Sequence, residues 1–190
     1  MDDIYKRRFI ELLETDRISP DCKIGENVKI GENTIIERGC NIGNNVFIGH
    51  NTVIRSGNTI GDDSVIGHLV MIEADSWIGK NTTIQSQCHI TKYAKIDDHV
   101  FIGPKAMLIN TNKISHGRDF EPNLEGPHIC FAARIGSGAI IMPGKIVGKN
   151  AVVGAGSVVT QNIPPEQIWY GNPARPARYF NVPYREILKK

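Results

Sequence analysis

The sequence predicts an all-β protein, a parallel β-helix of hexapeptide repeats with a short N-terminal helix, one long loop and an irregular or helical C-terminal tail. An aliphatic residue recurs every six positions from Ile18 to Leu108, and the spacing resumes from Ile129 to Val159. A period of six does not fit an α-helix, but it fits a short strand followed by a tight turn. Three repeats make one triangular coil, so the repeats predict roughly six to seven coils.

Residues 1–17 are expected to form a helical cap on the first coil. Tyr5, Phe9, Leu12 and Leu13 fall on one side of a helix over residues 2–16. The segment has no apolar stretch of the kind found in signal peptides, and no run in the chain approaches the roughly 20 apolar residues of a membrane span. The net charge of +2 does not indicate nucleic-acid binding. We therefore expect a cytoplasmic protein without a membrane or nucleic-acid partner.

The β-helix is expected over residues 18–160, and the other positions of each repeat are patterned too. Glycine often follows the aliphatic residue, which suggests a backbone conformation that side chains disfavour. The fifth position is small or β-branched and includes Cys22, Cys40 and Cys88. These cysteines are interpreted as core fillers. Without a CxxC pair, the four cysteines indicate reduced thiols and no zinc site.

The residue before each aliphatic residue should point outward, because side chains alternate along a strand. Residues 18 positions apart then stack in three columns. The column that starts at Lys23 is mostly polar, whereas those that start at Lys29 and Ile35 are mostly apolar. Two apolar outer faces exceed what a monomer normally exposes. Each chain is therefore expected to contact two neighbours in a closed homotrimer.

A long loop over residues 109–128 interrupts the repeat. Leu108 and Ile129 are 21 residues apart, which is three repeats plus three residues and suggests a register shift of half a repeat. Loops of this length in compact domains are usually functional or disordered. This loop leaves directly after Met107, in the outward column that contains His89, so it should reach into a cleft between subunits. Residues 161–190 form the expected tail, which is Pro-rich and ends in a short helix near residues 184–190.

The repeats, the single loop and the tail "YGNPARPAR" resemble the hexapeptide-repeat acyltransferases. "AARIGSGAIIMPGKIVGKNAVVGAGSVVT" is similar to the coenzyme A end of acetyltransferases in this family. "ITKYAKIDDHVFIGP", "INTN" and "EGPHI" look most like the nucleotide-sugar N-acetyltransferases. The resemblance implies left-handed coils, homotrimers with active sites between subunits, and acetyl-CoA as co-substrate without a metal. It further implies an acceptor amine on a dTDP- or UDP-linked deoxy sugar, and a role in lipopolysaccharide or surface-glycan synthesis.

The resemblance also implies a set of coenzyme A contacts. Backbone groups of Ser137 and Ala155 would contact pantetheine, and Thr160 would lie near the adenosine. Arg175 and Arg178 would meet the phosphates, a role that suits guanidinium groups.

One position departs from this pattern, because Gln161 stands where many relatives have lysine. Lys145 or Lys149 would then supply the positive charge. The alternative is that both lysines belong to an ordinary solvated face.

Two histidines are candidates for the base that removes the amine proton. His116 lies in the loop, where relatives with hydroxyl acceptors place a catalytic histidine; the alternative is a histidine that binds sugar or faces water. His89 is the only ionisable residue of its outward column as far as Met107. Its alternative is a packed histidine at the trimer interface.

The start of the loop supplies the candidates for acceptor binding. Asn110 and Asn112 would hold the sugar or orient the amine, and Arg118 would bind the nucleotide diphosphate. Thr111 stands between the two asparagines, where relatives often have an acidic residue.

Three other functions are alternatives. An O-acetyltransferase of a sugar or serine hydroxyl would use the loop histidine as base. A zinc-dependent carbonic anhydrase needs three histidine ligands, two of them about five residues apart, and no such pair exists; His50 and His68 would stack, but no third ligand is evident. A non-enzymatic β-helix would need neither the loop nor the tail arginines.

Overall fold

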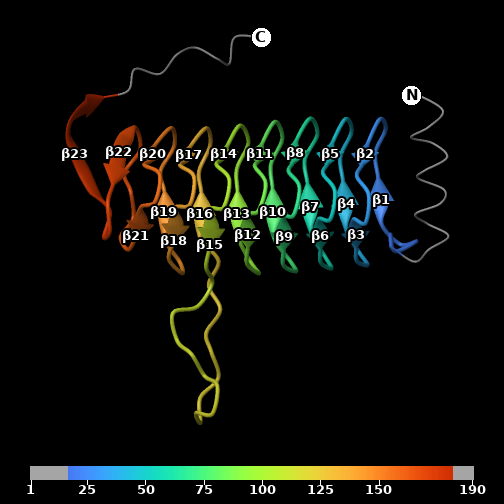
Figure 1. Ribbon diagram of the computed structural model, residues 1–190, viewed down its shortest axis with the longest axis horizontal. Coiled ribbons are helices and arrows are strands. Elements are labelled where there is room, and N and C mark those ends of the chain that lie inside the picture. The colour runs from blue at the N-terminus through green and yellow to red at the C-terminus, as the bar shows by residue number, and fades with distance from the viewer. Residues whose placement is uncertain (1–16, 182–190) are drawn as a thin grey trace.

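The computed structural model describes residues 17–181 and shows an elongated solenoid with one protruding loop (Figure 1). Three parallel sheets run along it, and we number them by their first strand. Sheet 1 contains β1 (Lys23–Ile24), β4 (Asn41–Ile42), β7 (Thr59–Ile60), β10 (Trp77–Ile78), β13 (Lys95–Ile96), β16 (His128–Ile129) and β19 (Ile146–Val147). Sheet 2 contains β2 (Lys29–Ile30), β5 (Phe47–Ile48), β8 (Val65–Ile66), β11 (Thr83–Ile84), β14 (Phe101–Ile102), β17 (Arg134–Ile135), β20 (Val152–Val153), β22 (Gln167–Tyr170) and β23 (Arg175–Asn181). Sheet 3 contains β3 (Ile35–Ile36), β6 (Val53–Ile54), β9 (Met71–Ile72), β12 (His89–Ile90), β15 (Met107–Leu108), β18 (Ile140–Ile141) and β21 (Val158–Val159).

The aliphatic ladder is the core of the solenoid, as predicted. Each aliphatic residue stacks on its equivalent one coil away, for example Ile78 on Ile60 and Ile96. These isoleucines are almost fully buried from Ile36 onward. The preceding residues point outward and stack in register, so the predicted columns are confirmed.

Small residues fill the corners inside the coils. Burial raises the pKa of the Cys40 and Cys88 thiols to about 11, which keeps them protonated and supports their interpretation as core fillers.

Turn geometry corrects the expected role of the repeated glycine. The left-handed conformation falls on the fourth position of the repeat, often an asparagine such as Asn27 or Asn45. The glycine after the aliphatic residue is needed because adjacent coils approach closely; a Cβ on Gly31 would collide with the backbone of Gly49. Asn27 Nδ2 donates to Asn45 Oδ1 at 3.2 Å, so the turns also form side-chain ladders.

The solenoid has about eight turns, slightly more than predicted, because residues after Thr160 add another coil. Ile163 bridges to Val147, and β22 pairs with β20 in parallel. β23 then returns antiparallel to β22, so the expected irregular tail is wrong for residues 167–181. The physical reason is Trp169, which is 7% exposed and closes the end of the core, outside the six-residue spacing.

The expected helices over residues 2–16 and 184–190 lie outside the described residues. Among residues 17–181 the structure contains no helix with the length and apolarity that a bilayer crossing requires.

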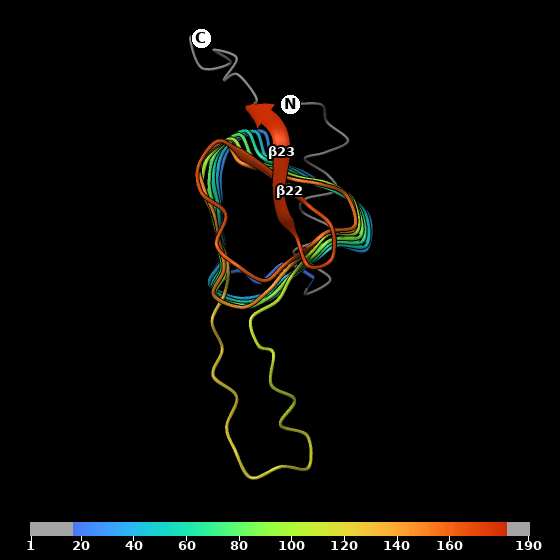
Figure 2. The same cartoon turned by 90° about the vertical axis from the view of Figure 1, so that its left-hand side faces the viewer.

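The loop is an insertion that leaves the order of coils unchanged. β15 lies in sheet 3 and β16 in sheet 1, the same succession as in other coils, so the expected shift of half a repeat is wrong. The extra residues leave the solenoid at one corner and return to it there. Figure 2 shows this loop extending away from the triangular cross-section.

Candidate active site

The outer face of sheet 3 lies between two corners that hold most of the candidate residues. The turns from sheet 2 to sheet 3 at residues 136–139 and 154–157 are called the glycine corner. The turns from sheet 3 to sheet 1, at residues 91–94, 109–127, 142–145 and 160–162, are called the loop corner. The coils therefore place a cofactor candidate on one side of this face and the loop on the other.

Ser137 and Ala155 stack directly on each other in the glycine corner. Both are exposed, and the Gly156 amide donates to the Ser137 carbonyl at 2.8 Å. Gly138 and Gly156 have positive φ, and a Cβ on either would meet nothing within 4 Å. This corner leaves its backbone open to a ligand that lies along the solenoid.

The tail continues the glycine corner. Gly171 accepts a hydrogen bond from the Val158 amide at 2.9 Å, and the Ala174 amide donates to the Val158 carbonyl at 2.8 Å. Arg175 follows at once; it is exposed, and its Nη1 donates to the Ala174 carbonyl at 2.8 Å. Arg178 lies further along β23. The tail thus brings Arg175 to the end of the column formed by Ser137 and Ala155.

The remaining cofactor candidates lie elsewhere. Thr160, Gln161 and Lys145 are in the loop corner, across sheet 3 from Ser137. The Lys149 ammonium group lies 5.3 Å from the centre of the Phe131 ring, at the corner between sheets 1 and 2. Of the two lysines considered as substitutes for the missing one, Lys145 is therefore closer to the sheet 3 face.

The two arms of the loop are joined at its root by Asn110. This residue is 7% exposed, and its Nδ2 donates to the Lys92 carbonyl at 3.3 Å. Its own carbonyl accepts from the Glu125 amide at 2.7 Å, and the Glu125 carbonyl accepts from the Gly144 amide at 3.0 Å. Asn110 therefore fixes where the loop leaves the coils.

Gly126 explains part of the "EGPHI" sequence. A Cβ at this position would collide with the carbonyl group of Tyr93 in the coil below. Glu125 and Gly126 thus take the place of the tight turn found in the other coils, between Tyr93 on one side and Gly144 on the other.

His89 has a carboxylate partner that the sequence did not reveal. Its Nε2 lies 3.2 Å from Glu73 Oε1, and the other Glu73 oxygen accepts from the Lys92 amide at 3.1 Å. The apolar neighbours of His89 in its column are Met71 and Met107. Glu73 lies 16 residues before His89, and the 18-residue stacking rule places it beside Thr91, so that rule alone does not identify the pair.

The loop tip carries the remaining candidates. Asn112, His116 and Arg118 are exposed, and within the described residues no side-chain hydrogen bond of His116 is present. The Arg118 amide donates to the Ser115 carbonyl at 2.8 Å, which shapes the turn. In one chain the tip extends away from the coils, so His116 is not brought together with His89 (Figures 1 and 2).

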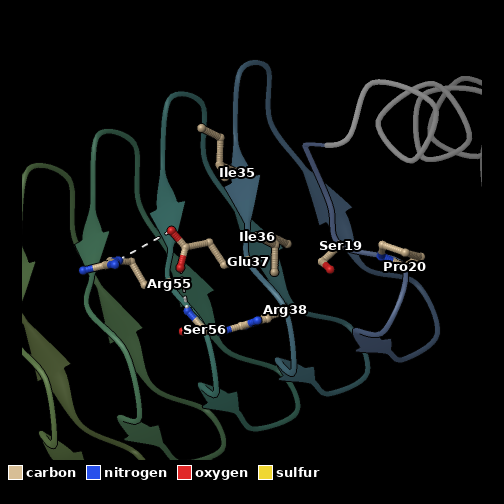
Figure 3. A pocket seen from close by; sticks show the side chains of 8 residues that line it. All are labelled: Ser19, Pro20, Ile35, Ile36, Glu37, Arg38, Arg55 and Ser56. Carbon is tan, nitrogen blue, oxygen red and sulfur yellow. Dashed lines mark hydrogen bonds and ion pairs between the residues drawn. The ribbon is translucent and has the colours of Figure 1, made fainter.

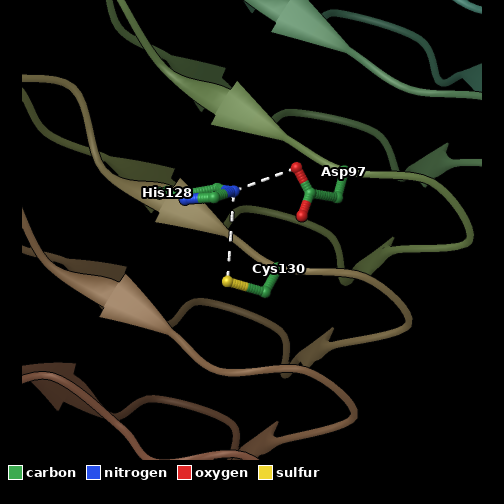
Figure 4. Close-up of side chains that lie close together, drawn as sticks. All are labelled: Asp97, His128 and Cys130. Carbon is green, nitrogen blue, oxygen red and sulfur yellow. Dashed lines mark hydrogen bonds and ion pairs between the residues drawn. The ribbon is translucent and has the colours of Figure 1, made fainter.

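A second polar cluster, also missed from the sequence, lies on sheet 1. His128 Nε2 is 2.9 Å from Asp97 Oδ1 and 3.9 Å from Cys130 Sγ (Figure 4). Burial, followed by the negative charge of Asp97, raises the pKa of the Cys130 thiol. Asp97 and His128 are separated by the loop in the sequence, which is why their proximity was not apparent.

Two other features lie apart from these candidates. An open hollow of about 510 Å³ lies near the first described coils and is lined by Ser19, Arg38 and Arg55 among others; Glu37 pairs with Arg55 at 3.5 Å (Figure 3). It contains none of the predicted residues. His50 and His68 stack with ring centres 5.1 Å apart, but each Nδ1 accepts a backbone amide, and among the described residues no third ligand joins them.

Family comparisons match both halves of the chain. Residues 10–93 match the GMPPB C-terminal domain, and residues 133–161 match the hexapeptide repeat of succinyl-transferase. Among solved structures, the polySia specific acetyltransferase NeuO is similar with a TM-score of 0.58 and 20% identity, covering 92% of each chain. This likeness supports the fold, and the structural neighbours are left-handed β-helices.

Curated relatives match over shorter segments. The galactoside O-acetyltransferase of Escherichia coli is 36% identical over 107 residues, which is 53% of this chain and 49% of the relative. The dTDP-3-amino-3,6-dideoxy-alpha-D-galactopyranose 3-N-acetyltransferase of Aneurinibacillus thermoaerophilus is 56% identical over 43 residues, or 23% of this chain and 22% of the relative. The chain thus spans about half the length of the first and less than a quarter of the second.

Proposed function

We propose that this chain, a left-handed β-helix of the hexapeptide-repeat acyltransferase family, transfers an acetyl group from acetyl-CoA to the amino group of a nucleotide-linked amino-deoxy sugar. The observation that carries the proposal is the position of the loop, which is rooted at one edge of the sheet 3 face while the open glycine corner forms the other edge. A donor along the glycine corner and an acceptor held by the loop would meet over this face. The apolar columns of sheets 2 and 3 support a homotrimer in which a neighbouring chain closes the cleft.

Coenzyme A is assigned to the glycine corner and the tail. Ser137 and Ala155 offer backbone groups beside two glycines whose missing side chains leave room for pantetheine. Arg175 and Arg178 lie on β23 beyond this corner and would contact the phosphates. Thr160 and Lys145 would approach the cofactor from the opposite corner.

The reaction requires a neutral amine to attack the thioester carbonyl. A carbon–nitrogen bond forms, the carbon–sulfur bond breaks, and the proton lost by nitrogen is transferred through a base to the coenzyme A thiolate. His116 is the proposed base because an exposed loop histidine can reach a neighbouring chain's cleft. His89, oriented by Glu73, is the second candidate, and Asn112 and Arg118 would bind the acceptor.

The second candidate function is O-acetylation of a sugar hydroxyl. It is favoured by the similarity to galactoside O-acetyltransferase and by the loop histidine. A hydroxyl is a weaker acid than a protonated amine is, so its attack depends more strongly on a positioned base. Loss of activity in His116→Ala would therefore be larger for a hydroxyl acceptor than for an amine.

The test is release of free coenzyme A thiol from acetyl-CoA against dTDP- and UDP-amino sugars, galactosides, maltose and serine. Release with an amino-sugar nucleotide, giving an amide product, supports the proposal. Release only with a hydroxyl acceptor favours the second function. His99→Gln is a suitable control for the His116 variant, because His99 packs against Phe131 at the corner between sheets 1 and 2, away from the sheet 3 face.

A further inference from the structure

We propose that Asp97, His128 and Cys130 form a binding site for a divalent transition metal ion of the zinc type, where the loop rejoins the coils. The site lies on sheet 1 and shares no residue with the proposed transfer site. Its donors are one carboxylate oxygen, one imidazole nitrogen and one sulfur, a set that suits zinc. This inference runs against the sequence-based expectation of no metal.

The three donor atoms lie close together. All lie within 4.8 Å of one another, with 2.9 Å from nitrogen to oxygen and 3.9 Å from nitrogen to sulfur. Bond lengths of about 2.0 Å to nitrogen and 2.3 Å to sulfur place tetrahedral nitrogen and sulfur ligands about 3.5 Å apart. The nitrogen and sulfur must approach by about 0.4 Å, and the oxygen and sulfur must come to a similar separation of about 3.5 Å, for the cluster to form three corners of a tetrahedron.

At this cluster the glycine that usually follows the aliphatic residue on sheet 1 is absent. On sheet 1 the residue after the aliphatic one is glycine in the other coils, namely Gly25, Gly43, Gly61, Gly79 and Gly148. Asp97 and Cys130 occupy that position in two successive coils, because Ile96 pairs with Ile129. His128 precedes Ile129 and points outward on the same strand. Two ligating side chains therefore replace the usual glycine at one place, and His128 in the outward column lies beside them.

The surroundings orient the carboxylate. Asp97 Oδ2 accepts the Phe131 amide at 3.2 Å, which leaves Oδ1 directed toward His128 (Figure 4). The side chains of Asp97 and His128 are 26% and 30% exposed, so an ion would be partly shielded from water and have an open fourth position. The Lys95 ammonium group lies 3.9 Å from Asp97 Oδ1 and would compete with a metal for this oxygen.

Bound metal would connect the end of the loop to the preceding coil. Asp97 precedes the insertion and the other two ligands follow it, so coordination would restrain the returning arm at His128. Metal binding must also displace the thiol proton of Cys130, because the thiolate is the ligand.

The experiment is titration of the metal-free full-length protein with Co²⁺, and competition by Zn²⁺. We expect one cobalt ion per chain, with thiolate-to-cobalt charge-transfer absorption and release of a proton. Zinc should remove the absorption by displacing cobalt, and zinc added alone should cause the same proton release. Cys130→Ser should abolish the charge-transfer absorption, and His128→Gln and Asp97→Asn should weaken binding at least tenfold. Lys95→Met should tighten it by about threefold or more, because a competing positive charge is removed.

Two variants serve as controls. Cys22→Ser and His50→Gln change the same residue types outside the cluster and should bind cobalt as the unmodified protein does. No thiolate–cobalt absorption in the unmodified protein, or the same absorption in Cys130→Ser, would overturn the proposal. Because the unmodified protein gives the deciding signal, a variant that misfolds does not leave the question open.

Discussion

The coils and the loop use the same residue types under opposite constraints. Ile90 is 0% exposed and stacks between Ile72 and Leu108, whereas Ile114 at the loop tip is 78% exposed. In the coils every residue faces an equivalent residue 18 or so positions away, so each position has a structural role. The loop has no such neighbours in its own chain, so its side chains are available to a substrate or a second chain. The comparison locates specificity in the loop and stability in the coils.

The two regions meet at a short root. Asn110, Glu125 and Gly126 make the contacts that set the direction of the loop, and they lie at the edge of the sheet 3 face. Changes at the root should therefore affect both regions, whereas changes elsewhere should affect only one.

The largest effect is expected from truncating the ladder. Ile90→Ala should lower the free energy of unfolding by about 2–5 kcal/mol, because it removes buried methyl groups and leaves a cavity. Ile114→Ala should change it by less than about 0.5 kcal/mol, because the side chain is exposed. Denaturant unfolding at one fixed protein concentration measures both. Equal losses would show that the loop packs against a chain partner as firmly as the coils do.

Variants at the two candidate bases should differ in their effect on turnover. His116→Ala should lower kcat about 10²-fold or more if His116 is the base, while stability is unchanged. A decrease of less than tenfold would transfer the role to His89 or to no protein base. Glu73→Gln then distinguishes these, since it removes the carboxylate charge beside His89 while an amide oxygen can still accept the Lys92 amide, and it should alter the pH profile only if His89 acts.

Substituting one glycine at the root of the loop and one at its tip compares how far each position determines stability and transfer. Gly126→Ala should cost about 1–3 kcal/mol and reduce transfer, because its Cβ would collide with the Tyr93 backbone and displace the arm. Gly117→Ala, with φ of 67° and nothing within 4 Å, should cost only about 1 kcal/mol of backbone strain. Unfolding midpoints and transfer rates of the two variants make the comparison. A Gly126→Ala protein that matches Gly117→Ala in both would refute the root assignment.

The smallest effect is expected from surface charge on the coils. Lys80 Nζ lies 2.8 Å from Asp62 Oδ2, and this contact lowers the pKa of Asp62 and raises that of Lys80. Both groups are exposed, so Lys80→Met should shift the unfolding midpoint only slightly at neutral pH. Because the pKa of Asp62 is lowered in the folded state, the contact stabilises the folded protein at pH values above the ordinary carboxyl pKa of 3.8. That contribution disappears as the pH falls through the lowered pKa of the folded state. The difference between the two proteins should therefore vanish in acid; a difference that grows there would contradict this sign.

The sequence predicted what repeats and missed what occurs once. The period of six revealed the ladder from Ile36 onward and the outward columns, because each position is repeated in many coils. Trp169 closes the core outside that spacing, so the pattern predicted an irregular segment where β22 forms. His89 is unusual in its column, but its partner Glu73 lies 16 residues earlier and occupies a different position of the repeat. The stacking of residues 18 apart therefore does not pair them. Asp97 and His128 are separated by the loop, and only the pairing of β13 with β16 brings them together.

The most direct test of the division between coils and loop is a protein that lacks residues 112–123, with Asn110, Glu125 and Gly126 retained at the root. Its coenzyme A affinity and its acetyl-transfer rate would be measured beside those of the full chain. The account predicts a coenzyme A Kd within about twofold of the original and transfer reduced at least 10²-fold. Transfer at the original rate, or loss of coenzyme A binding together with transfer, would contradict it.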